Sequence, residues 1–153
     1  MRCENRKLPE EELTREIIGC FFYVYNTLRY GFLESVYSNA LAKVLKRTGH
    51  KVEREARIPV WFEREIIGFH RLDMIVDEKV VIEIKATERL PEIADRQLRS
   101  YLNATRLEVG LILHFGVEAK AHRVSPRTKR PSQESPDAHR QDPVDPQDQS
   151  IEQ

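Results

Sequence analysis

Three charged residues occupy apolar stretches of the sequence, where a charge is costly. Asp73 lies within residues 72–76, and Glu83 and Lys85 alternate with aliphatic residues in the run 80–86. If that run is a β-strand, Glu83 and Lys85 point to one face, because side chains alternate along a strand. Burying an ionised group is expensive unless the group is paired or binds an ion. The pattern therefore predicts a specific interaction that holds these charges in place.

The spacing of the two acidic residues predicts that their carboxylates meet. A tight turn at residues 77–78 would join two strands into an antiparallel hairpin, in which Asp73 lies opposite Glu83. Two neighbouring carboxylates repel each other unless a hard divalent cation binds both through oxygen. We therefore expect Mg²⁺ or Mn²⁺ at this position.

An alternative interpretation needs no metal. Glu83 and Lys85 can form an ion pair on a solvated strand face, with Asp73 as a cross-strand partner of Lys85. Short Glu-x-Lys patterns are frequent in charged proteins, so the tripeptide alone does not decide. The addition of Asp73 at a spacing compatible with a hairpin favours the metal site.

Hydrophobic periodicity predicts the elements that position these residues. Apolar residues at helical spacing predict three helices: the first is capped by Thr14 and stopped by Gly31, the second is stopped by Gly49, and the third opens at Pro91. Alternating or continuous apolar segments predict strands at 52–62, 65–69, 71–76, 80–86 and 109–115. A strand, a crossover helix and a strand form a parallel pair, so the expected fold class is α/β, a central mixed β-sheet flanked by helices.

Composition divides the chain into two parts. Its 153 residues carry 25 Lys+Arg and 25 Asp+Glu, so no net charge attracts nucleic acid. Five of the eight prolines fall within residues 126–153, where no aromatic residue occurs. Such a segment buries too little apolar surface to offset the entropic cost of ordering. We expect a folded domain over residues 8–124 and a disordered, Pro/Gln/Asp-rich C-terminal tail over residues 125–153.

The sequence also bears on location. The two cysteines, Cys3 and Cys20, lack the spacing of metal ligands, so neither a disulfide framework nor a zinc site is expected. The longest apolar run, residues 17–25, is shorter than the ~20 residues that cross a bilayer, and no signal-peptide core follows the first residues. We expect a cytoplasmic protein with no membrane partner.

Residues 31–37, GFLESVY, resemble the signature of the GxxExxY family, small proteins assigned to the PD-(D/E)XK nuclease-like superfamily. The resemblance continues through Leu72-Asp73, Glu83-Ile84-Lys85 and the segment QLRSY at residues 97–101. Leu72 stands where the superfamily's name has proline. The resemblance implies a restriction-endonuclease-like fold, with Asp73 and Glu83 as metal ligands, Lys85 as the catalytic lysine and Glu34 as an acidic residue from an N-terminal helix.

These roles agree with the chemistry of phosphodiester hydrolysis. The reaction needs a neutralised phosphate, a deprotonated water and a stabilised leaving group, and a divalent ion assists all three. The backbone carbonyl of Ile84 is a further candidate ligand, since hard cations accept backbone oxygen, and Glu34 would bind the ion directly or through a water. Lys85 would orient the attacking water and stabilise charge on the phosphate.

The third helix supplies the remaining candidates. Gln97 and Tyr101 share one helix face and are similar to a pattern of RecB-like exonucleases that borders the active site. They would fix Lys85 or touch the scissile strand. Arg99, with Arg96 and Arg106, forms a basic group, so Tyr101 and Arg99 are the candidate substrate-binding residues.

Several residues have an ordinary structural explanation. Glu34 suits the first turn of a helix, where the helix dipole favours an acid. Backbone shape is the expected role of Gly31, core packing that of Tyr37, and a structural role that of His70 and His114. Trp61 and Phe62, near the hairpin, could stack on a base, but core or hairpin packing is the expected role.

Two functions follow from these observations. The first is a metal-dependent nuclease with Glu34, Asp73, Glu83, Lys85 and Gln97 as its catalytic set, which cuts DNA by attack of an activated water. The alternative is a non-catalytic nuclease-fold module that binds nucleic acid or a protein partner. A homodimer is an open arrangement for either one.

Overall fold

The computed structural model describes residues 7–126 of the chain. Within this range the elements follow one another as α1 (Glu11–Leu28), α2 (Glu34–Arg47), β1 (Val52–Phe62), β2 (Glu65–Val76), β3 (Val80–Lys85), α3 (Ile93–Thr105), β4 (Val109–Phe115) and β5 (Ala119–Val124). The expected C-terminal tail, residues 125–153, lies outside the described residues from residue 127 onward.

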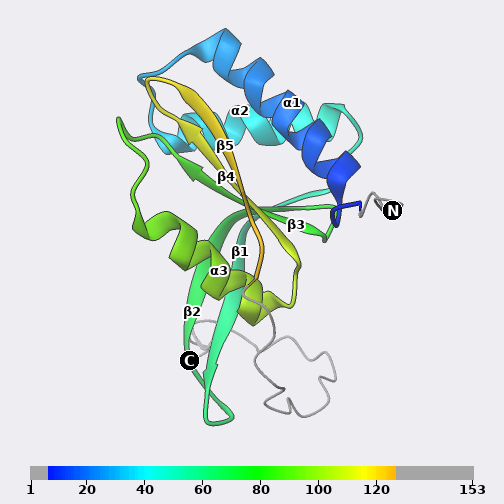
Figure 1. Cartoon of the computed structure of the whole chain (residues 1–153), viewed down its shortest axis with the longest axis vertical. Coiled ribbons are helices and arrows are strands. Elements are labelled where there is room, and N and C mark those ends of the chain that lie inside the picture. Colours follow the sequence, from blue (N-terminus) through cyan, green and yellow to red (C-terminus); the bar gives the residue numbers. More distant parts are fainter. Residues whose placement is uncertain (1–6, 127–153) are drawn as a thin grey trace, which may run out of the picture.

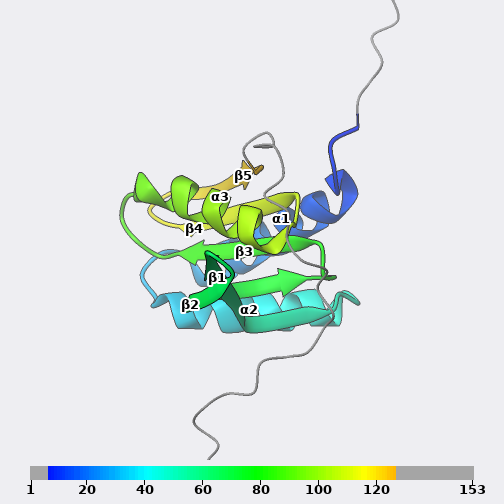
Figure 2. The same ribbon diagram turned by 90° about the horizontal axis from the view of Figure 1, so that it is seen from below.

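The strands form one sheet in the order β1-β2-β3-β4-β5. β3 and β4 are parallel, as the crossover helix α3 requires, and the other neighbouring pairs are antiparallel. The α1 and α2 helices cover one face of the sheet, and α3 covers the other (Figures 1 and 2). The predicted α/β class, a mixed sheet flanked by helices, is therefore confirmed.

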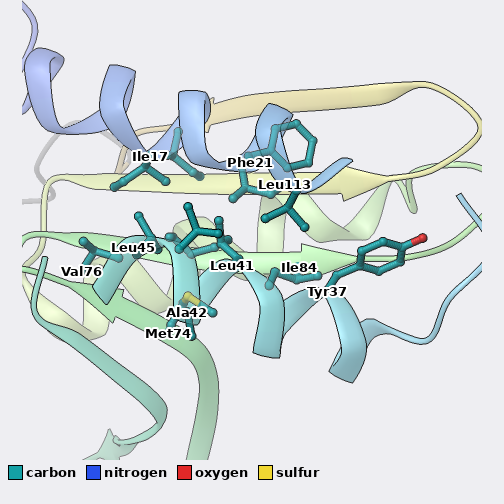
Figure 3. Packing of buried hydrophobic residues seen from close by; sticks show 14 of the residues in the cluster. Ile17, Phe21, Tyr37, Leu41, Ala42, Leu45, Met74, Val76, Ile84 and Leu113 are labelled. Atoms are coloured by element: carbon teal, nitrogen blue, oxygen red, sulfur yellow. The ribbon is translucent and has the colours of Figure 1, made fainter. Parts of the chain in front are cut away.

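The face under α1 and α2 is the larger core. Aliphatic and aromatic side chains of α1 and α2 pack on β3 and β4, with Phe21, Tyr37 and Leu41 fully buried among them (Figure 3). The amphipathic spacing of the first two helices thus buries an apolar stripe on the sheet. The other face holds a smaller cluster in which Leu98 and Leu102 of α3 cover Val81 and Ile112.

Four expectations on element bounds are corrected. Thr14 is not the cap of α1 but lies inside its first turn, where its hydroxyl donates a hydrogen bond to the carbonyl oxygen of Glu11 at 3.0 Å. α1 ends at Leu28, before Gly31, and α3 begins at Ile93, after Pro91. The two predicted strands at 65–69 and 71–76 are one continuous strand, β2, because β1 pairs with β2 along nearly the whole length of β2.

A fifth strand, β5, was not predicted from the sequence. Its burial alternates, and Val124 is its only large aliphatic residue. It lies at the sheet edge beside β4, where charged side chains are tolerated because one edge faces solvent.

The far ends of β1 and β2 extend beyond the rest of the sheet as a two-stranded arm, residues 57–71 (Figure 1). Trp61 and Phe62 lie on the hairpin at the tip of the arm rather than in the core, since their side chains are 61% and 60% exposed. No helix in the described part of the chain is both long and apolar enough to cross a membrane.

Candidate active site

Strand β2 turns over at Asp73. Leu72 packs in the cluster under α3, whereas Met74 packs in the cluster under α1 and α2. Residues two apart in a regular strand share one face, so the strand reverses its faces between them. On β1, the facing residue Glu55 has a left-handed φ of 52°, and it separates the pairs that Leu72 and Met74 form with that strand.

This reversal releases Asp73 from the ladder with β3. The ladder ends at the pair Met74 and Ile82, in the register that the hairpin spacing predicted. Beyond that pair, Asp73 Oδ2 accepts a hydrogen bond from the backbone N–H of Ile84 at 2.7 Å. The Asp73 carboxylate therefore takes the place of a backbone carbonyl and lies against β3 next to Glu83.

Glu83 is a buried carboxylate on the α3 face of the sheet. Its side chain shares a face with Val81, and the residue is 8% exposed. Burial first, and then the negative charge of Asp73, raises the pKa of the Glu83 carboxyl to about 8, while Lys85 acts in the opposite direction. The expected meeting of the two carboxylates is thus present, and it is electrostatically unfavourable.

The two oxygens of Glu83 have different surroundings. Oε2 lies 3.9 Å from the ammonium nitrogen of Lys85. Oε1 is buried and has no hydrogen-bond partner among the described residues. A buried polar atom without a partner costs free energy, so this oxygen is available to a ligand.

Glu34 reaches the end of β3 from the N-terminus of α2. Its Oε2 accepts a hydrogen bond from the backbone N–H of Ala86 at 3.3 Å, and its charge contributes to the raised pKa of Glu83. The preceding loop is shaped by Gly31, which has a φ of 129°, a conformation that favours glycine. Residues 31, 34 and 37 therefore supply, in one short segment, a glycine that shapes the loop, an acidic side chain at the end of β3 and an aromatic residue that fixes the loop.

Tyr37 fixes the loop that precedes α2. Its hydroxyl accepts a hydrogen bond from the N–H of Phe32 at 3.1 Å and donates one to the carbonyl oxygen of Arg29. The fully buried ring stacks on Phe115 with centroids 4.2 Å apart. Tyr37 is a core residue, as predicted, and it also holds the loop that leads to Glu34.

Helix α3 brings only one of its three candidates to the acidic residues. The ring of Tyr101 stacks on His70 with centroids 3.4 Å apart, and the charge of Glu83 contributes, after burial, to a raised pKa of Tyr101. Gln97 is exposed and makes no hydrogen bond with the described residues. Arg99 is held on the other flank of α3 by Asp95, with 2.6 Å between Nε and Oδ2.

His70 is the residue that the sequence analysis missed. Its Nε2 lies 4.0 Å from Glu83 Oε1, and burial lowers the pKa of its imidazole. Regular alternation along a strand puts residues 70 and 73 on opposite faces, so no spacing in the sequence links them. Only the reversal of β2 at Asp73 brings both residues to Glu83.

The donor set suits a hard divalent cation. Carboxylate and backbone oxygens are the ligands that Mg²⁺ and Mn²⁺ prefer, and one of these oxygens, Glu83 Oε1, lacks any other partner within residues 7–126. Over the same range, no three carboxylate, imidazole or thiol side chains are already gathered around one point. Instead, the Asp73 carboxylate accepts a hydrogen bond from the backbone N–H of Ile84, and the Glu34 carboxylate accepts one from the backbone N–H of Ala86.

A mixed sheet with a reversed strand that carries an aspartate, next to a strand that carries Glu-x-Lys, is the architecture of a nuclease-like α/β domain. The chain belongs to the PD-(D/E)XK nuclease superfamily, whose family model matches residues 11–126. Among solved structures, the crystal structure of SSO0001 is similar, with a TM-score of 0.50 and 19% sequence identity. The match covers 76% of this chain and 59% of that one, and at this identity it supports the fold alone. A search of the curated proteins found no match.

Proposed function

We propose that this chain is a nuclease of the GxxExxY type that hydrolyses phosphodiester bonds of DNA with Mg²⁺ or Mn²⁺ as its cofactor. The observation that carries the proposal is the Glu83 carboxylate, buried beside Asp73 with one oxygen unpartnered among the described residues. A divalent cation is the ligand that removes both the repulsion and the missing contact. Membership of a nuclease superfamily supports the reaction class.

Four groups of the chain would hold the ion. Asp73 and Glu83 would bind through carboxylate oxygens and Ile84 through its backbone carbonyl, while Glu34 would bind directly or through a water. A bound divalent ion neutralises phosphate charge and assists the deprotonation of water. To bind, Asp73 and Glu34 would turn oxygens that now accept backbone N–H groups, or use the second oxygen of each carboxylate.

The remaining candidates would act on the substrate. The Lys85 ammonium stands beside Glu83 and would orient the attacking water and stabilise charge on the phosphate. Gln97 and Tyr101 would contact the scissile strand from α3. To contact a phosphate, Arg99 would leave its half-buried ion pair with Asp95 and the carbonyl oxygen of Ser125, to which it now donates.

We also propose that the activity resides in the domain over residues 8–124, apart from the tail at 125–153, and that the protein is cytoplasmic. The oligomeric state is open, and light scattering of the full chain in solution distinguishes a homodimer from a monomer by its mass.

A non-catalytic nuclease-fold module is the second candidate. Two observations favour it. Within residues 7–126 no three potential metal ligands are gathered around one point, and Arg99 is paired with Asp95 away from the acidic residues. Such a module would bind nucleic acid or a protein partner without cutting, and the same assay separates it from the nuclease.

The test is a panel of end-labelled duplex, single-stranded and branched DNA, with RNA counterparts, incubated with the full chain and Mn²⁺. We expect cutting of DNA by the wild type and a loss of at least about 100-fold in Glu83→Ala and Lys85→Ala, typical of removing a group that acts on the transition state. Glu118→Gln and Lys43→Ala, both exposed, are matched controls that keep wild-type rates. Binding without cutting would favour the module, and equal cutting by all variants would contradict the proposed site.

A further inference from the structure

Two buried polar atoms face each other next to Lys85 without a hydrogen bond. His70 Nε2 and Glu83 Oε1 are 4.0 Å apart, and neither has a partner within the described part of the chain. A hydrogen bond between nitrogen and oxygen requires about 2.7–3.2 Å, so the two atoms do not satisfy each other. A gap of this kind in a folded protein indicates a missing third atom.

The width of the gap suits a metal ion. Zn²⁺, which represents the first-row divalent ions, lies about 2.0–2.1 Å from an imidazole nitrogen and about 2.0–2.2 Å from a carboxylate oxygen. Two such donors on opposite sides of one ion are therefore up to about 4.2 Å apart, close to the 4.0 Å between His70 Nε2 and Glu83 Oε1. The orientation of the Glu83 carboxylate is set on its other side, because Oε2 already faces the ammonium group of Lys85.

The orientation of the imidazole is also fixed. Its ring lies flat on Tyr101 of α3, with an interplanar angle of 12°. A ring held in this way loses little freedom when its nitrogen binds an ion. Tyr101 therefore holds the His70 ring in place by stacking on it, a role that the position of Tyr101 in the sequence does not reveal.

We propose that His70 is a nitrogen ligand of the cation bound by Asp73 and Glu83, and that Tyr101 positions it. The inference rests on the proposed function, because it assumes that the acidic residues bind a divalent ion. An imidazole nitrogen is a poorer donor for Mg²⁺, which prefers oxygen, than for Mn²⁺ and later transition metals. His70 therefore makes the site selective for Mn²⁺ over Mg²⁺.

The test is pulsed electron paramagnetic resonance of Mn²⁺ bound to the full chain, which detects a directly bound ¹⁴N nucleus. We expect ¹⁴N modulation in the wild type and its loss in His70→Phe, which keeps a ring to stack on Tyr101 but lacks Nε2. His50 is the matched control, because it also lies between carboxylates, 2.9 Å from Glu16 and 2.7 Å from Asp77. The modulation is expected to persist in His50→Gln.

Affinity provides a second measurement. We expect His70→Phe to weaken Mn²⁺ binding by about tenfold or more and Mg²⁺ binding by less than about threefold, since only the nitrogen-preferring ion loses its ligand. His70→Gln, which supplies an oxygen donor in place of the nitrogen, is expected to bind Mg²⁺ at least as well as the wild type and to lack the preference for Mn²⁺.

The outcomes separate the two proposals. If the wild type binds Mn²⁺ without ¹⁴N modulation, His70 does not bind the ion, and if His70→Phe keeps the modulation, another nitrogen produces it. In either case the His70 proposal is wrong while the acidic site stands. If the wild type binds neither ion, the metal site of the proposed function is wrong, and the His70 proposal is overturned with it.

Discussion

The two faces of the sheet differ in what they bury. The face under α1 and α2 holds a cluster of eighteen buried residues, all of them apolar or aromatic. The face under α3 holds a cluster of nine, and the buried Glu83 and His114 share that face. The three buried side-chain atoms without a partner among the described residues all lie on the α3 side: His70 Nε2, Glu83 Oε1 and His114 Nδ1.

This difference indicates a division of labour. Apolar burial contributes most of the free energy of folding, and it is concentrated on the first face. The second face carries charges whose burial lowers stability unless a ligand compensates. Truncating an apolar residue on the first face should therefore reduce stability without affecting metal binding, whereas neutralising the buried acid on the second face should weaken metal binding and stabilise the metal-free protein.

The largest expected effect comes from the first face. Leu41→Ala removes a fully buried side chain of α2, and we expect a loss of about 2–5 kcal/mol in the free energy of unfolding. Urea unfolding monitored by circular dichroism measures it. The affinity of the folded protein for Mn²⁺ should stay within about twofold, since Leu41 packs on the face of the sheet opposite Glu83. A large change in affinity would contradict the separation of the two faces.

The next effect tests the approach of α3 to the sheet. A Cβ atom on Gly110 would lie 2.8 Å from Leu98, so Gly110→Ala forces the buried helix side chain to move. We expect a loss of about 1–3 kcal/mol. Gly19→Ala is the control, because Gly19 lies in α1 with nothing within 4 Å of an added Cβ, and it should gain up to about 1 kcal/mol. Equal effects in the two variants would show that α3 does not pack closely at Gly110.

The third prediction concerns Glu83 without metal. Its pKa in the folded state is raised to about 8, above the unfolded value, so the folded state keeps a proton that the unfolded state releases. Wild-type stability therefore falls as the pH rises from about 4.5 to about 8. Glu83→Gln carries no charge at this position, and in chelator at pH 8 it should be more stable than wild type by on the order of 2 kcal/mol.

Thermal unfolding at pH 5 and pH 8 measures this effect. The difference in stability between Glu83→Gln and the wild type should grow with pH. Mn²⁺ should stabilise the wild type and not Glu83→Gln. A variant that is less stable than wild type at pH 8 would show that the buried carboxylate is already well compensated.

The smallest expected effect concerns the loop before Glu34. Tyr37→Phe removes the hydroxyl that holds the backbone of Arg29 and Phe32 but keeps the ring on Phe115. We expect a loss of about 1 kcal/mol in stability. Amide hydrogen exchange should increase at Phe32, whose N–H loses its acceptor. Unchanged exchange at Phe32 would show that the Tyr37 hydroxyl does not hold the loop.

Much of the fold could be predicted because local patterns determine it. The helical spacing in α1 and α2, the aliphatic run of β3 and the parallel pair around α3 all follow from which residues are apolar. The hairpin register that brings Asp73 to Glu83 follows from a turn position. β5 could not be predicted, since an edge strand of alternating small and charged residues buries little.

The site was predictable only in part. Asp73, Glu83, Lys85 and Glu34 are marked by charge in apolar surroundings or by a motif, and the structure places them together around the end of β3. The proximity of His70 to Glu83 depends on the reversal of β2 at Asp73, which no local pattern in the sequence marks. The exposed position of Trp61 likewise depends on how far the arm extends beyond the sheet.

Calorimetric titration of Mn²⁺ into the full chain measures whether Asp73 and Glu83 bind the same divalent cation. We expect one site in the wild type, weakened by about 30-fold or more in Asp73→Asn and Glu83→Gln, which is about 2 kcal/mol for a lost charged ligand, and unchanged in Glu118→Gln. Equal affinity in Asp73→Asn and wild type, or no binding to the wild type, would rule out a cation shared by the two carboxylates.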